Sequence, residues 1–117
     1  MEIWENGPYK EIWIDTDEDG DGPSMMGLIH GDFGWLMYLR GQCDAGFSSR
    51  NPDYPDTDDG EMMDFLLSNG QLDYYPMSFI LPVQQVMEAL EYFEKSKKPP
   101  KFITWHNDSN DGVSLND

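Results

Sequence analysis

Apolar residues recur at helical spacing in one stretch late in the chain. They share one face of a helix of about 3.6 residues per turn, at Val83, Val86, Met87, Leu90 and Phe93. Pro82 suits the first helical position, because its missing N–H needs no partner there. Pro99 and Pro100 end the pattern. The sequence therefore predicts one long amphipathic helix over about residues 82–97.

Shorter apolar runs separated by turn residues precede this helix, and one follows it. The run 101–105, Lys-Phe-Ile-Thr-Trp, is rich in β-branched and aromatic residues and predicts a closing strand. Asn-Gly pairs between apolar runs are strong hairpin signals, and they occur at Asn6-Gly7 and Asn69-Gly70. The earlier strands are predicted at about 2–5, 11–14, 24–30, 33–40, 41–49, 61–67 and 71–75.

Runs of short strands followed by one helix are typical of the α+β class. We expect a mainly antiparallel sheet of about five to seven short strands, with the helix packed on one face. Residues 1–106 would form this single domain, with a buried and inert Cys43 in the 41–49 strand. Residues 107–117 are polar and acidic, and we expect them to be a frayed tail.

The charge of the chain limits its possible partners. Aspartate and glutamate number 23 against 7 lysines and arginines, so the net charge is −16. Such a charge repels nucleic acid and anionic membranes and attracts basic protein surfaces. The alternative is that the charge serves solubility alone. The single cysteine excludes an intrachain disulfide, and the acidic start of the chain does not resemble a signal peptide. We therefore expect a cytoplasmic protein without a membrane span.

Two acidic loops hold most of the candidate contact residues. The first, residues 15–21, begins like a calcium loop, D-x-D-x-D-G, but Pro23 and Met26 occupy the ninth and twelfth positions, where ligands are needed. The second, residues 53–61, surrounds Tyr54 with carboxylates. Each loop is a solvated turn, a weak cation site or an anionic surface for a protein partner. The candidate contact residues are Asp15, Asp17, Glu18, Asp19, Asp21, Asp53, Tyr54, Asp56, Asp58, Asp59 and Glu61.

Motifs for catalysis are missing from the sequence. His30 and His106 lie in no recognisable motif, and no nucleophile elbow, phosphate loop or dinucleotide fingerprint occurs. With 23 acidic residues, a pair of carboxylates says nothing about hydrolysis. We expect no enzymatic activity, no catalytic residue and no cofactor.

Several short motifs occur together in a telling order. They are Gly34-Trp35-Leu36-Met37-Tyr38, Tyr74-Tyr75-Pro76, Ile80-Leu81-Pro82, the helix core with Ala89, Leu90 and Phe93, and Pro100-x-x-Ile103-x-Trp105. Over roughly residues 25–106 the chain thereby resembles the first-described family of immunity proteins of bacterial polymorphic-toxin systems, many of which accompany deaminase toxins. The resemblance implies an α+β fold and an inhibitory role in competition between bacteria. The matching residues are structural, so they do not locate the toxin-binding site.

Charge and resemblance together lead to a functional hypothesis. Deaminase and nuclease toxins bind a polyanion, so their active-site clefts are usually basic. We expect the loops 15–21 and 53–61 to dock on the cleft of a cognate secreted toxin, with Tyr54 as an anchor. The alternatives are a calcium- or metal-binding module that uses the 15–21 loop, and an acidic adaptor that has no toxin partner.

Overall fold

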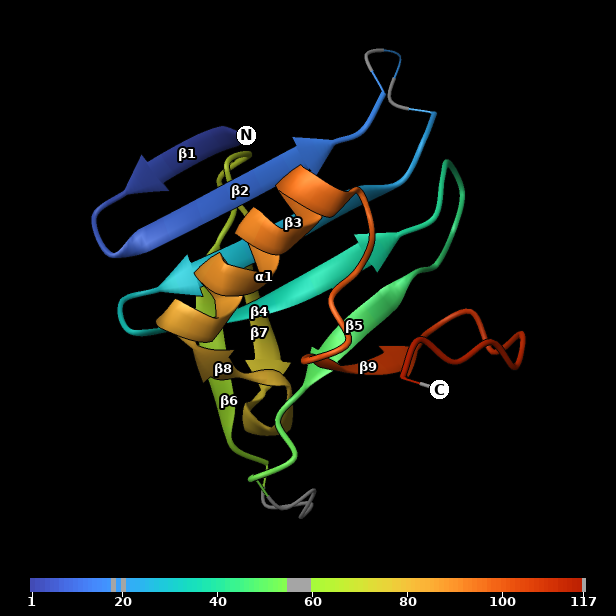
Figure 1. Cartoon of the computed structure of the whole chain (residues 1–117). Coiled ribbons are helices and arrows are strands. Elements are labelled where there is room, and N and C mark those ends of the chain that lie inside the picture. The colour runs from blue at the N-terminus through green and yellow to red at the C-terminus, as the bar shows by residue number, and fades with distance from the viewer. Residues whose placement is uncertain (18, 20, 55–59, 117) are drawn as a thin grey trace.

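The computed structural model of the chain describes residues 1–17, 19, 21–54 and 60–116. Nine strands, one 3-10 helix and one α-helix follow one another along these residues (Figure 1). They are β1 (Glu2–Asn6), β2 (Tyr9–Asp15), β3 (Ser24–His30), β4 (Phe33–Leu39), β5 (Phe47–Arg50), β6 (Met62–Leu66), β7 (Leu72–Pro76), η1 (Met77–Phe79), β8 (Leu81–Pro82), α1 (Val83–Ser96) and β9 (Thr104–Asn107).

The predicted α+β fold is confirmed. An antiparallel sheet has the order β1-β2-β3-β4-β5-β9, and the short β8 also pairs with β4. The helix α1 packs on one face of this sheet, and β9 closes it. Within the described part of the chain, α1 and η1 are too short or too polar to cross a membrane.

The central strand β3 carries apolar side chains on both faces of the sheet. Met25 and Ile29 belong to the core beneath α1, whereas Met26 and Leu28 belong to a second core on the opposite face. Gly27 lies between them under the helix, where an added Cβ would come within 3.0 Å of Leu90 Cδ1. The glycine therefore lets α1 approach the sheet closely.

The second core is covered by a hairpin of β6 and β7, which form a separate two-stranded sheet. Phe65 is fully buried there together with Trp35 and Ile80, and the Trp35 and Tyr75 rings lie 4.3 Å apart between centroids. Figure 1 shows α1 in front of the sheet and this hairpin behind it. The protein thus has three layers, one more than the sequence predicted.

Two boundary predictions were wrong. The fifth strand begins at Phe47, and Cys43 lies before it as an exposed residue with φ of 63°, not as a buried strand residue. The local cause is a loop that Asp44 closes by accepting a hydrogen bond from the backbone N–H of Arg40 at 2.9 Å. The closing strand is Thr104–Asn107, shifted beyond the predicted 101–105.

The described C-terminal residues fold back on the domain, in place of the frayed tail that their polar composition predicts. The Asn116 side chain accepts a hydrogen bond from Trp105 N at 3.0 Å and donates one to Ile103 O at 2.8 Å (both pairs measured between heavy atoms). Leu115 packs against the core beneath α1. A side-chain amide that pairs with strand backbone in this way extends the sheet edge.

The hairpin layer can be tested with a pair of variants. Phe65 is fully buried, so Phe65→Ala should lower the free energy of unfolding by about 3–5 kcal/mol. Leu72→Ala removes a 44% exposed side chain of the same hairpin and should change it by less than about 0.5 kcal/mol. Denaturant titration measures both values. Equal effects of the two variants would contradict the docking of β6 and β7 on the sheet.

Candidate protein-binding surface

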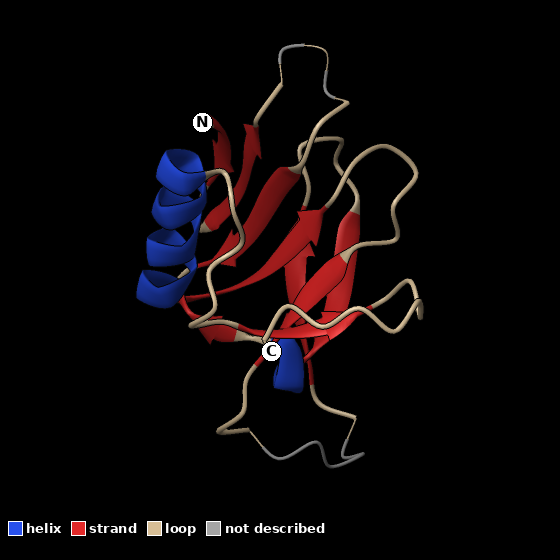
Figure 2. Cartoon of the chain, turned by 45° about the vertical axis from the view of Figure 1, so that its right-hand side comes forward, coloured by secondary structure: helices blue, strands red, loops and turns tan. Residues whose placement is uncertain are grey.

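The two predicted acidic loops leave opposite ends of the sheet. The first follows β2 and the second follows β5, and three antiparallel steps (β2–β3, β3–β4 and β4–β5) point these two strands in opposite directions. Figures 1 and 2 both place the β2–β3 connection at one end and the β5–β6 connection at the other. The structure therefore does not join the candidate residues into one patch.

The first loop carries exposed carboxylates, and hydrogen bonds join the residues at its two ends. Thr16 donates from its N–H and its hydroxyl to the carbonyl oxygen of Pro23, at 3.1 and 2.7 Å. The amide of Gln42 donates to Asp21 Oδ1 at 2.5 Å and ties the loop to the β4–β5 connection. Asp15, Asp17, Asp19 and Asp21 are exposed, and Glu18 lies outside the described residues.

The second loop is only partly described, because Asp56, Asp58 and Asp59 lie outside the described residues. Asp53 and Glu61 are exposed. The predicted anchor Tyr54 is partly buried, and its hydroxyl donates to Glu61 Oε2 at 3.0 Å. Tyr54 thus contacts a carboxylate of its own chain in this structure.

A feature that sequence reasoning missed lies on β1 and β2, on the sheet face that also carries the hairpin. Two hollows of about 310 and 220 Å³ lie side by side there and share Glu2 and Trp13 in their walls. We call this surface the tryptophan trough and define it by Glu2, Trp4, Glu11, Trp13, Asp15 and Asp17. Both tryptophans are partly buried, in contrast with the buried Trp35 and Trp105.

Strand register explains why indoles and carboxylates alternate in the trough. In the β1–β2 pairing Glu2 lies opposite Trp13, and Trp4 lies opposite Glu11. Residues paired across an antiparallel ladder share a face, as do residues two apart along a strand. The hairpin predicted at Asn6-Gly7, with this register, would have placed these side chains together. What the sequence did not reveal is that the β6–β7 hairpin ends at the trough, where Ser68 Oγ donates to Glu11 Oε2 at 2.5 Å.

The β6–β7 hairpin also exposes apolar side chains on its outer face. Met62, Leu72 and Tyr74 are 53%, 44% and 58% exposed. The register pairs Met62 with Pro76 and Leu66 with Leu72 on that face. Because Met62 directly follows the second acidic loop, this end of the molecule also combines carboxylates with an apolar side chain, whereas Leu72 lies at the turn end of the hairpin.

A polar cluster fixes the hairpin to the sheet. The Tyr9 hydroxyl donates to Asp64 Oδ2 at 2.5 Å, and His30 Nδ1 lies 2.9 Å from the Asp64 carbonyl oxygen, to which it donates. The hydrogen bond between Tyr9 and Asp64 raises the pKa of the phenol and lowers the pKa of the carboxyl. His30 thus helps to hold the hairpin against the sheet.

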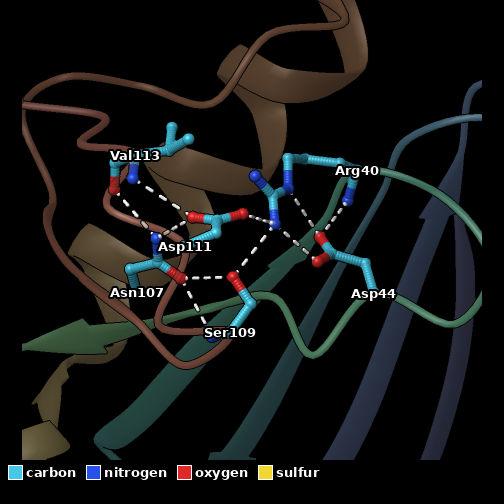
Figure 3. A network of polar contacts seen from close by, with 6 residues as sticks. All are labelled: Arg40, Asp44, Asn107, Ser109, Asp111 and Val113. Carbon is cyan, nitrogen blue, oxygen red and sulfur yellow. Dashed lines mark hydrogen bonds and ion pairs between the residues drawn. The ribbon is translucent and has the colours of Figure 1, made fainter.

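Arg40 ties the C-terminal residues to the β4–β5 connection (Figure 3). Its guanidinium donates to both carboxylate oxygens of Asp44 at 2.9 and 2.7 Å, and lies 2.8 Å from Asp111 Oδ2. The bonds from Arg40 lower the pKa of Asp44. Hydrogen bonds from Asn107, the Val113 backbone and Arg40 lower the pKa of Asp111.

No protein-family model matches this chain, and no curated protein sequence matches it. The resemblance to immunity proteins therefore stays a prediction that depends on the motifs themselves. The features that bear on the class of the protein therefore lie on its surface: its charge, its partly buried indoles and the position of each acidic loop.

The Arg40 network predicts a specific response to pH. Because the folded-state pKa values of Asp44 and Asp111 lie below the unfolded value of about 3.9, the network stabilises the fold above about pH 4, and this stability is lost as the pH falls through the folded-state values. Arg40→Gln should return the Asp44 pKa toward about 3.9 and shift Asp111 less, since Asn107 and Val113 still donate to it. A carboxyl NMR titration measures both groups. Lys10→Gln is the control, and unchanged Asp44 titration in Arg40→Gln would contradict the assignment.

Calcium binding by the first loop is tested by calorimetry. No three His, Cys, Asp or Glu side chains converge among the described residues in a way that could hold a metal ion, and the sequence lacks the bidentate glutamate of a calcium loop. We expect no saturable heat and no rise in the midpoint of thermal unfolding when calcium is added. A saturating isotherm, abolished by Asp15→Asn with Asp17→Asn, would contradict this expectation and support the metal-binding alternative.

Proposed function

We propose that this protein is a non-enzymatic immunity protein that binds and neutralises a cognate secreted bacterial toxin, a nucleic-acid deaminase or nuclease, in the cytoplasm. The observation that carries the proposal is the gathering of exposed carboxylates at the β2–β3 end of a chain of net charge −16, next to partly buried indoles. The resemblance of the chain to polymorphic-toxin immunity proteins points to the same role.

Electrostatics gives the proposed inhibitor a physical basis. An enzyme that acts on nucleic acid needs a cleft of positive potential to hold phosphates. A protein with 23 acidic and 7 basic side chains repels nucleic acid and is attracted to such a cleft. Opposite charge also speeds the encounter, which suits an inhibitor that must reach the toxin before the toxin acts.

Charge alone does not select one toxin among several basic proteins. Specificity comes from a few buried anchors and from groups that reject the wrong partner. At the β2–β3 end Trp4 and Trp13 are available as anchors beside the carboxylates. At the opposite end Tyr54 already bonds Glu61, and the exposed Tyr74 is the better placed aromatic residue. We assign the main contact to the β2–β3 end and a peripheral role to the 53–61 loop.

The proposal is tested by co-expression with the catalytic domains encoded beside the gene for this protein. One inactivated domain should co-purify with it, and the complex should block that domain's activity on nucleic acid. Failure of every neighbouring domain to bind the wild-type protein would overturn the proposed function.

Charge reversal then locates the contact. Asp19→Lys with Asp21→Lys should slow association at low salt by about tenfold or more. Glu88→Lys with Glu91→Lys changes the net charge equally on the exposed side of α1 and should have a much smaller effect. Stopped-flow mixing at two salt concentrations measures the rates. Equal slowing by the two pairs would show that only the total charge matters.

A further inference from the structure

We propose that the tryptophan trough binds the arginine or lysine side chains of an extended basic segment of the partner protein. The inference rests on the proposed function for the identity of that partner, a toxin with a basic surface. It adds the place of contact, the residues that make it and the chemical group they recognise.

The shape of the trough fits an extended chain. Its two hollows share walls and follow β1 and β2, and Glu11, Trp13 and Asp15 repeat every second residue along β2. Glu11 and Asp15 are thus about 13 Å apart along the strand. An extended segment also directs every second side chain to one side, so its alternate cations match this repeat.

The chemistry of the walls fits a cation with a flat or apolar body. Indole faces attract ammonium and guanidinium groups through their π electrons, and carboxylates accept paired hydrogen bonds from guanidinium. In the trough each indole has a carboxylate opposite it, as in the pair of Trp4 with Glu11. A partly buried indole next to a carboxylate removes water from one side of the ion pair, which strengthens it.

Among the described residues, no cation is paired with the carboxylates of the trough, although Glu11 accepts a hydrogen bond from Ser68. The backbone nitrogen of Met1, which also lines the trough, lies 3.4 Å from Glu94 Oε2 on α1. Lys10 pairs with Glu5 at 3.9 Å, and both lie on the other face of the sheet.

Charge also decides which occupant the trough takes. A second copy of this chain would bring another −16 charge and would be repelled. A nucleic acid would be repelled for the same reason. A basic protein segment satisfies both the carboxylates and the indoles, so the proposal commits to that occupant.

The direct test uses a defined probe, a capped six-residue peptide of alternating arginine and threonine. At about 0.15 M salt, where the screening length is about 8 Å, the peptide should change the tryptophan fluorescence of the wild-type protein and give a saturable calorimetric isotherm. Trp4→Leu keeps an apolar side chain and the net charge but removes the indole, and it should weaken binding about threefold to fivefold. Glu2→Gln should weaken it at least as much.

A matched control distinguishes binding in the trough from general electrostatic attraction between the peptide and the acidic protein. Glu88→Gln removes the same charge from the exposed side of α1 and should leave the affinity for the peptide within about 1.5-fold. Circular dichroism and the unfolding midpoint confirm that each variant is folded. Equal losses in Glu2→Gln and Glu88→Gln, with no loss in Trp4→Leu, would overturn the proposal.

Measurements with the toxin distinguish this inference from the proposed function. If a neighbouring catalytic domain binds the wild-type protein, and Trp4→Leu and Glu2→Gln bind it equally well, the trough assignment fails and the proposed function stands. If the peptide binds in the trough but no such domain binds the protein, the proposed function fails and the trough stands as a site for basic peptides.

Discussion

Burial of β3 on both faces is the constraint on which the rest of the structure depends. Its side chains alternate between a core under α1 and a core under the β6–β7 hairpin. A strand that is apolar on both faces needs a covering layer on each side. Gly27 brings α1 close on one side, and Phe65 with Trp35 fills the other.

Incomplete covering of the sheet creates the candidate site. The hairpin covers the middle of its face and ends where Ser68 meets Glu11. Beyond that point, β1 and β2 present Trp4 and Trp13 with only part of each indole buried. Of these two strands, β2 leads into the acidic β2–β3 connection, and Glu2 of β1 lies opposite Trp13, so anchors and steering charge lie close together.

Patterns within short stretches of the sequence predicted the helix and the hairpin turns, because these elements depend on neighbouring residues. The amphipathic repeat located α1, and Asn6-Gly7 and Asn69-Gly70 located two hairpins because the turns need residues that tolerate positive φ. Alternation of apolar residues, however, predicts only that one face of a strand is buried. It does not predict which helix or hairpin packs on that face. The hairpin layer was missed for that reason, and the trough with it, because its exposure depends on where that layer ends.

Long-range pairs account for the remaining errors. Cys43 was expected in a strand, but the bond of Arg40 to Asp44 closes a loop there, and Asp111 joins the same arginine from far along the chain. The described carboxylates of the two acidic loops are exposed, whereas Tyr54 is partly buried, and the order of the strands separates the loops. The composition gives the net charge of the chain, but the positions of the charged side chains on the surface depend on the order of the strands.

The most direct test of this account is oxidative footprinting of the four tryptophans, read by mass spectrometry in the free protein and in the complex with its partner. Trp4 and Trp13 should be oxidised faster than Trp35 and Trp105 in the free protein and should become protected in the complex. Equal reactivity of all the tryptophans in the free protein, or full reactivity of Trp4 and Trp13 in the complex, would contradict this account.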